Sequence, residues 1–182
     1  MVVETVVVAL WAMLPAYVPN NAAVLFGGGA PIDGGREWRG RRLLGDGKTW
    51  RGTAVGIAAG VALAIVLDAV QPAVSGATGF DIPGFPLAVG AALAAGAMLG
   101  DILASFLKRR TGRDRGAAFP GLDQLDFVVV SLLLVALVAP TWFRGVFLSE
   151  PLRLVVVLVA TPLLHLVTNA GAYVLGLKDE PY

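Results

Sequence analysis

Five long apolar segments run through this chain of 182 residues and leave little choice of fold. Each is near the roughly 20 residues that an α-helix, rising about 1.5 Å per residue, needs to cross about 30 Å of hydrocarbon. With 57% apolar and only 15% charged residues, the chain lacks the polar surface of a soluble enzyme. We therefore predict an all-α integral membrane protein, a single domain over residues 1–182 with about five transmembrane helices. The predicted spans are approximately 2–26, 53–71, 86–108, 127–143 and 152–177.

The connections between these segments differ in charge. Segment 27–52 carries six basic and three acidic residues, and segment 108–126 carries five and three. Segment 72–85 has no Lys or Arg, and segment 144–151 has only Arg144. Because positive loops stay inside, the two basic connections are predicted to be cytoplasmic, with the amino terminus outside and the carboxyl terminus inside. This predicts a multi-pass protein of the cell membrane whose polar site faces the cytoplasm.

Small residues recur at every fourth position in two of the predicted spans. They are Gly52, Gly56 and Gly60 in the second span, and Gly96 and Gly100 in the third. This spacing lets helix backbones approach closely inside a membrane, so we interpret these glycines as packing positions. The chain has no cysteine, which excludes disulfides, thiolate ligands and cysteine nucleophiles.

Three carboxylates mark a candidate site near the predicted cytoplasmic surface. Asp101 lies about 21 Å along the third span, counted at about 1.5 Å per residue, where an unpaired charge is costly. Asp123 and Asp126 are three residues apart, so they share one face at the start of the fourth span. Carboxylates without His or Cys suit Mg²⁺ together with substrate phosphates. The other interpretation of Asp123 and Asp126 is that they are acids in a first helical turn, where the helix dipole favours them.

Basic and hydroxyl side chains lie next to these carboxylates. Ser105 and Lys108 follow Asp101 on one helix face, which ends in the cluster Lys108, Arg109 and Arg110. In the first basic connection, Gly47, Lys48, Thr49 and Arg51 lie in a glycine-rich stretch suited to phosphate oxygens. This is not a Walker A loop, because Arg42 occupies the position of its first glycine. A positively charged loop with turn glycines is the alternative.

Polar side chains in the first and last spans complete the set of candidates. Asn20 and Asn21 lie at the predicted cytoplasmic end of the first span, beside the glycine-rich connection. Pro15 and Pro19 precede them and are expected to interrupt helical hydrogen bonding where backbone can line a polar cavity. His165 and Asn169, four residues apart in the last span, either line the same cavity or make interhelical hydrogen bonds.

The stretch from Gly100 to Asp126 resembles the membrane cytidylyltransferases that make CDP-diacylglycerol. Their signature is Ser-x-x-Lys-Arg, a spacer, Pro-Gly and an Asp-x-x-Asp pair, and the matching residues here are Ser105, Lys108, Arg109, Pro120, Gly121, Asp123 and Asp126. With its short five-span chain and glycine loops, the sequence is similar over nearly its whole length to the archaeal branch, the CDP-archaeol synthases. It departs from the bacterial pattern in lacking His-Gly-Gly before Asp123 and in having Gln124 after it.

The resemblance implies transfer of CMP from CTP to an isoprenoid ether-lipid phosphate, 2,3-bis-O-geranylgeranylglycerol 1-phosphate, with release of pyrophosphate. An anionic phosphate nucleophile needs charge neutralisation and alignment rather than a protein nucleophile. We expect Mg²⁺ on Asp101, Asp123 and Asp126, with Asp101, Asp123 and Lys108 as the catalytic residues. The expected substrate-binding residues are Asn21, Gly47, Lys48, Thr49, Arg51, Ser105, Arg109 and Arg110.

Two other functions compete with this one. A CDP-alcohol phosphotransferase also uses aspartates and Mg²⁺, but its Asp-Gly-x-x-Ala-Arg opening is absent and its aspartates have a different spacing. A non-catalytic transporter or channel subunit would use Asp101 as an ion site. The transporter hypothesis does not account for the glycine-rich connection. CTP, the lipid phosphate and the membrane are the expected partners, no nucleic acid is expected, and the oligomeric state is left open.

Overall fold

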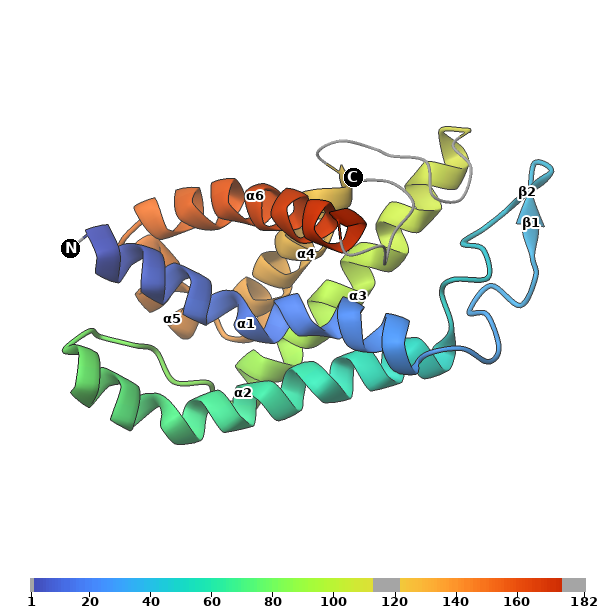
Figure 1. Ribbon diagram of the computed structural model, residues 1–182. Helices are drawn as coiled ribbons and strands as arrows, with labels where there is room; N and C mark the ends of the chain where they lie inside the picture. The colour runs from blue at the N-terminus through green and yellow to red at the C-terminus, as the bar shows by residue number, and fades with distance from the viewer. Residues whose placement is uncertain (1, 113–121, 175–182) are drawn as a thin grey trace.

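The structure is a computed structural model, and it describes residues 2–112 and 122–174. The side chains of residues 122, 123, 168–170, 172 and 174 lie outside this description. Its elements are α1 (Val2–Phe26), the strands β1 (Glu37–Trp38) and β2 (Arg41–Arg42), α2 (Trp50–Thr78), α3 (Leu87–Arg110), α4 (Leu122–Val138), α5 (Pro140–Phe143), the π-helical turn η1 (Arg144–Leu148) and α6 (Leu152–Val174) (Figure 1). The predicted all-helical architecture is thus present, with one short antiparallel hairpin in the first basic connection.

Helix α1 continues through Pro15 and Pro19, so the prolines interrupt its hydrogen bonding, as predicted, without ending the helix. Pro19 has no N–H to donate to the carbonyl of Pro15 four residues earlier. The backbone of α2 packs at this place, since a Cβ on Gly60 would lie 2.6 Å from the Pro15 oxygen. One turn further on, a Cβ on Gly56 would lie 2.8 Å from the Pro19 oxygen. The glycines therefore let α2 lie against the proline face of α1, as their spacing predicted.

Helices α3 and α4 approach each other even more closely. A Cβ on Gly96 would lie 2.4 Å from the Ser131 Cα, and a Cβ on Gly100 would lie 2.5 Å from the Asp126 oxygen. The buried Ser131 hydroxyl donates to the Leu93 carbonyl at 2.9 Å and ties the two helices together. This contact places Asp126 of α4 beside the turn of α3 that carries Asp101.

The prediction of one helix over residues 127–143 is wrong. Helix α4 ends at Val138, and Pro140 begins the separate short helix α5, because proline has no N–H to continue the first helix. By length and apolar composition, α1, α2 and α3 can each cross a membrane, and the α5–η1 segment with α6 forms a pair bent by 85° that could be a fourth span. Helix α4, with 17 residues, lies at the short limit for a straight span.

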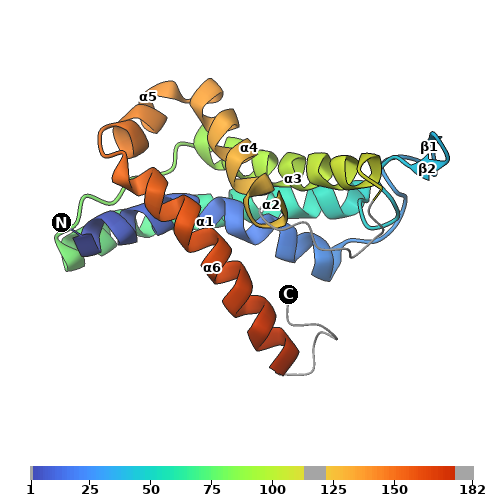
Figure 2. The ribbon, with the colours of Figure 1, turned by 90° about the horizontal axis from the view of Figure 1, so that it is seen from above.

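Different chain segments lie at the two ends of the molecule. The β1–β2 hairpin and the carboxyl end of α3 lie at one end, and the amino terminus lies at the other (Figures 1 and 2). The first basic connection and the start of the second are therefore at the same end. Helix α6 packs against α1 and turns away from α3 toward its carboxyl end (Figure 2).

Candidate active site

The first basic connection is folded around a buried carboxylate, Asp33. Its oxygens accept hydrogen bonds from Arg42 Nη2 at 2.7 Å and from the backbone N–H groups of Gly35, Leu44 and Gly45 at 3.0–3.1 Å. The Arg42 guanidinium and these N–H groups hold the pKa of Asp33 well below its usual range, although burial opposes them. The ion pair in turn raises the pKa of Arg42. Asp33 thus gives this connection a defined shape.

The fold of this connection positions Lys48 and Thr49 directly before the start of α2. Backbone hydrogen bonds from Ile32 N to the Lys48 oxygen and from Trp50 N to the Ala30 oxygen fix this stretch on both sides. Thr49 is the N-cap of α2, and its hydroxyl accepts the Gly52 N–H at 3.0 Å. A short polar residue is favoured here because it satisfies an N–H that the helix leaves unpaired.

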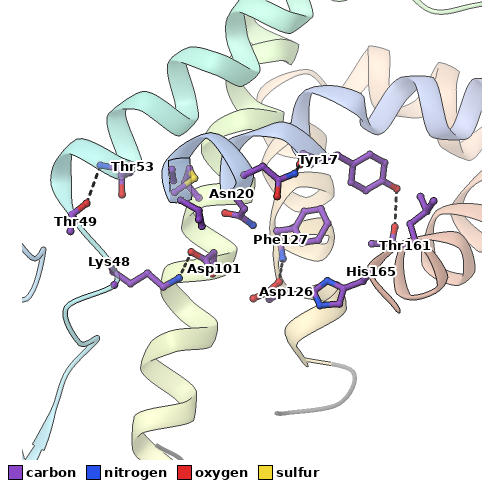
Figure 3. A pocket seen from close by; sticks show the side chains of 17 residues that line it. Tyr17, Asn20, Lys48, Thr49, Thr53, Asp101, Asp126, Phe127, Thr161 and His165 are labelled. Carbon is purple, nitrogen blue, oxygen red and sulfur yellow. Dashed lines mark hydrogen bonds and ion pairs between the residues drawn. The ribbon is translucent and has the colours of Figure 1, made fainter. Parts of the chain in front are cut away.

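A cavity of about 490 Å³ lies between this loop and helices α1, α2, α3, α4 and α6. Figure 3 shows Lys48 and Asp101 on one side of it and Thr161 and His165 of α6 on the other, with Asn20 and Asp126 between them. The lining residues are Tyr17, Asn20, Asn21, Ala23, Val24, Gly47, Lys48, Thr49, Gly52, Thr53, Met98, Asp101, Asp126, Phe127, Thr161, Leu164 and His165. Five helices and the loop thus share one cavity.

The shortest polar contact in the cavity joins Lys48 and Asp101. Lys48 Nζ lies 2.5 Å from Asp101 Oδ2, and the two side chains are 24% and 26% exposed. The carboxylate deep in α3 is therefore paired, which lowers the cost of a charge at this depth. Both groups also line the cavity. A bound phosphate can therefore pair with the Lys48 ammonium, and a bound cation can pair with the Asp101 carboxylate.

Three oxygen-bearing side chains in the cavity are of the chemical type that Mg²⁺ prefers. Asp101 and Asp126 both line it, and the buried Oδ1 of Asn20 has no hydrogen-bond partner among the described residues. Asp126 Oδ1 also accepts the Phe127 N–H at 2.6 Å, which orients the carboxylate at the start of α4. The side chain of Asp123 lies outside the described residues. No group of three or more His, Asp or Glu side chains that could hold a metal occurs in the described part of the chain.

Several predicted substrate-binding residues reach the cavity, and others do not. Asn21, Gly47, Lys48 and Thr49 line it. Arg51, Ser105, Lys108, Arg109 and Arg110 are not among its lining residues. The Ser105 hydroxyl donates to the Asp101 carbonyl at 2.9 Å, within its own helix. Arg109 packs over the glycine loop, since a Cβ on Gly45 would lie 3.1 Å from its Nη2.

Arg110 contacts the β1–β2 hairpin at the end of α3. It donates to the carbonyls of Trp38 at 2.7 Å and Arg42 at 2.9 Å, and its guanidinium stands 5.2 Å from the centre of the Trp38 ring. These contacts fasten the β1–β2 hairpin to the end of α3. They favour a structural role for Arg110 rather than substrate binding.

Sequence reasoning missed four polar residues of this region. Tyr17, Thr53 and Thr161 line the cavity, and Asp33 organises the loop beside it. Helical spacing could have found two of them, because Tyr17 is four residues before Asn21 and Thr161 is four residues before His165. Asp33 gave no such signal, since its partners lie in turns.

Comparison with known proteins identifies the family of the chain. The family described as CarS-like CDP-archaeol synthase matches residues 2–182. The chain belongs to the CDP-archaeol synthase family. It is 66% identical to the CDP-archaeol synthase of Halorubrum lacusprofundi over 182 residues, which is all of both chains, and 68% identical to that of Halobacterium salinarum over 99% and 98% of the two chains.

The chain is also similar to more distant CDP-archaeol synthases and to a solved structure. The CDP-archaeol synthase of Methanosarcina mazei is 46% identical over 93% of this chain and all of its own. A solved structure of an intramembrane enzyme for archaeal membrane lipids biosynthesis has a TM-score of 0.67 and 37% identity, covering 88% of this chain and 92% of its own. The predicted membrane fold and the predicted family are therefore confirmed.

Proposed function

We propose that this protein transfers CMP from CTP to 2,3-bis-O-geranylgeranylglycerol 1-phosphate, forming CDP-archaeol and pyrophosphate. Its full-length relatives are named CDP-archaeol synthase, which supports the product. The observation that carries the proposal is the cavity that brings the loop lysine Lys48 together with Asp101 and Asp126. A cation and carboxylates in one cavity suit a reaction between two phosphates, whose charge must be neutralised.

The protein's part in this reaction is to bind and align two anions. An oxygen of the lipid phosphate attacks the α-phosphorus of CTP, a new P–O bond forms, and the bond to pyrophosphate breaks. The nucleophile is already anionic, so no protein group has to become a nucleophile. Lys48, held by the loop at the start of α2, places positive charge where the triphosphate enters from the cytosolic end.

The expected metal is Mg²⁺, and Asp101 and Asp126 are its proposed protein ligands, with Asp123 of the same helix turn as a third. Asn20 Oδ1, without a hydrogen-bond partner in the described part of the chain, adds a neutral oxygen to the set. A Mg²⁺ ion held there would supply the positive charge that offsets the charge of the pyrophosphate leaving group. The carboxylates would hold the ion, and the close α3–α4 contact at Gly100 fixes the two helices that carry them.

We propose that the cavity faces the cytoplasm. The first basic connection and the start of the second lie at the same end of the molecule, next to Lys48, as expected of two cytoplasmic loops. CTP is a cytosolic nucleotide, so this orientation gives it direct access to the loop. Accessibility labelling of single cysteines placed at Arg39 and at Gln71 in intact cells or oriented vesicles would test the orientation.

Purified protein supplied with labelled CTP, Mg²⁺ and the geranylgeranyl ether phosphate should release pyrophosphate and form a labelled CDP-lipid. Omission of the lipid should stop pyrophosphate release, which separates lipid-dependent transfer from CTP hydrolysis. Replacement of Mg²⁺ by a chelator should stop both. Absence of any CDP-lipid from several lipid phosphates would reject the proposal.

A further inference from the structure

The α1–α6 side of the cavity includes two apolar side chains that are exposed at the surface. Val24 of α1 and Leu164 of α6 line the cavity while being 85% and 45% exposed. Next to them on the same helices, Leu25 and Leu163 are 74% and 56% exposed. In a membrane helix, exposed apolar side chains face hydrocarbon. The cavity therefore has an apolar rim on its α1–α6 side and a polar loop on its α2–α3 side.

Helices α1 and α6 are joined inside this rim by two hydroxyl groups. Tyr17 Oη and Thr161 Oγ1 are 2.8 Å apart, and the Thr161 hydroxyl donates to the Val157 carbonyl at 2.7 Å. A hydroxyl has one proton to give, so Tyr17 must be the donor to Thr161. Both protons are thus used in holding α1 to α6. Neither hydroxyl can donate to a ligand without breaking this connection.

His165 is the other polar side chain that α6 contributes to the described cavity lining. It comes one helical turn after Thr161, on the same face, and is partly buried. Figure 3 shows it on the opposite side of the cavity from Lys48, with Asp126 between them. An imidazole N–H in a cavity that the apolar side chains of Val24 and Leu164 also line is placed to donate to an anion whose tail lies in hydrocarbon.

We propose that His165 binds the phosphate of the lipid substrate, while its chains leave the cavity over the apolar rim formed by Val24 and Leu164. CTP then occupies the Lys48 side, and the two phosphates meet near Asp101 and Asp126. This inference rests on the proposed function for the identity of the lipid. It assigns the two substrates to opposite sides of the cavity. Substitutions on the Lys48 side should therefore change KM for CTP, and substitutions on the His165 side should change KM for the lipid phosphate.

The test compares His165→Ala and His165→Gln in steady-state kinetics with each substrate varied in turn. His165→Ala should raise KM for the lipid phosphate about tenfold, which corresponds to about 1.4 kcal/mol, and leave KM for CTP within about twofold. His165→Gln keeps an N–H donor and should recover much of the loss. Leu163→Ala, an exposed neighbour on α6 that does not line the cavity, is the matched control and should behave as wild type.

The role of the apolar rim is tested separately, by placing a larger side chain at Leu164. Leu164→Trp should raise KM for the geranylgeranyl substrate more than KM for a short-chain ether phosphate, because the short chains do not have to cross the rim. An equal change for both lipids would overturn the role of the rim. An unchanged lipid KM in folded His165→Ala, or a rise confined to the CTP KM, would overturn the role of His165.

Direct binding distinguishes a failure of this inference from a failure of the proposed function. Binding of the lipid phosphate alone to wild type and to His165→Ala is measured in detergent by the shift in thermal unfolding. Wild-type turnover together with His165-independent binding rejects the inference but not the function. His165-dependent binding without turnover in wild type rejects the function but not the phosphate site. Should His165→Ala fail to fold, His165→Phe, which keeps a ring without an N–H donor, replaces it and should raise KM for the lipid phosphate in the same way.

Discussion

Lys48 Nζ lies 2.5 Å from Asp101 Oδ2, which joins the glycine-rich loop to α3 across 53 positions of sequence. The contact holds the loop over the cavity and gives the carboxylate a counter-charge inside the membrane-spanning part of the protein. A bound triphosphate would compete for Lys48, and bound Mg²⁺ would compete for Asp101. We therefore expect substrate binding to replace the ion pair by contacts to the substrate and the metal. The two partners can be tested one at a time.

Asp101→Asn should reduce turnover at least about a hundredfold, the scale found when a preorganised charge-stabilising group is removed. Folding should persist, because Lys48 is 24% exposed and water can solvate it once its partner is neutral. Turnover and thermal unfolding are measured together. Asp81→Asn, in the exposed connection before α3, is the control and should behave as wild type. Wild-type turnover in Asp101→Asn would remove this residue from the metal site.

Lys48→Met should raise KM for CTP by about tenfold or more, because a charge-assisted contact to phosphate is lost. Lys48→Arg keeps the charge and should retain more affinity than Lys48→Met, although its planar group is larger. Initial rates at varied CTP and saturating lipid check this. A CTP KM that does not change in Lys48→Met would place the triphosphate elsewhere in the cavity.

Gly100→Ala should lower both stability and turnover. Its Cβ would lie 2.5 Å from the Asp126 oxygen and 2.6 Å from the Phe127 Cα, so α3 and α4 must move apart at the carboxylates. Overpacking of this kind costs about 1–3 kcal/mol. Gly76→Ala in α2 has no atom within 4 Å of the added Cβ and serves as the matched control. Thermal unfolding and turnover of both variants separate helix propensity from crowding; equal behaviour of the two would exclude crowding.

Asp33 should stabilise the loop at every pH from about 5 to 8. Its pKa is lowered in the folded protein, so its contribution is complete above the unfolded value of about 4 and is lost as the pH falls below it. Asp33→Asn should therefore be less stable than wild type by a constant amount in that range. Melting temperatures measured against pH check this. A difference that disappears between pH 8 and 6 would assign the effect to another group.

Arg110→Ala should release the hairpin without changing nucleotide affinity. The carbonyl contacts to Trp38, Arg41 and Arg42 are lost, so hydrogen exchange in residues 36–42 should accelerate. KM for CTP should stay within about twofold of the wild-type value, less than the tenfold change that about 1.4 kcal/mol of lost binding would cause. Arg36→Ala, an exposed arginine of the same connection, is the control. A large rise in the CTP KM of Arg110→Ala alone would restore Arg110 to the substrate-binding set.

Apolar length and charge placement by themselves determine the membrane class and set the two basic connections apart from the others. Glycine spacing likewise predicts the close helix contacts, because backbone approach depends on local residue size. The sequence also indicates Asp101, Asp126, Lys48, Thr49 and Asn21, because ionisable or amide groups at the ends of apolar spans are conspicuous, and all five line the cavity. It does not reveal the break between Val138 and Pro140, since residues 127–143 carry no charged side chain on either side of the proline and so resemble one span in composition.

Only the tertiary structure decided which polar groups share the cavity. Arg110 and Ser105 carry the same chemistry as cavity residues, yet their hydrogen bonds go to the hairpin and to their own helix. Asp33 and Tyr17 have local sequences that do not reveal their partners, which come from turns and from α6. Side-chain direction depends on how helices cross and how loops close, and those depend on contacts far apart in the chain. The sequence thus determined which chemistry the protein carries, and helix packing decided where it is carried out.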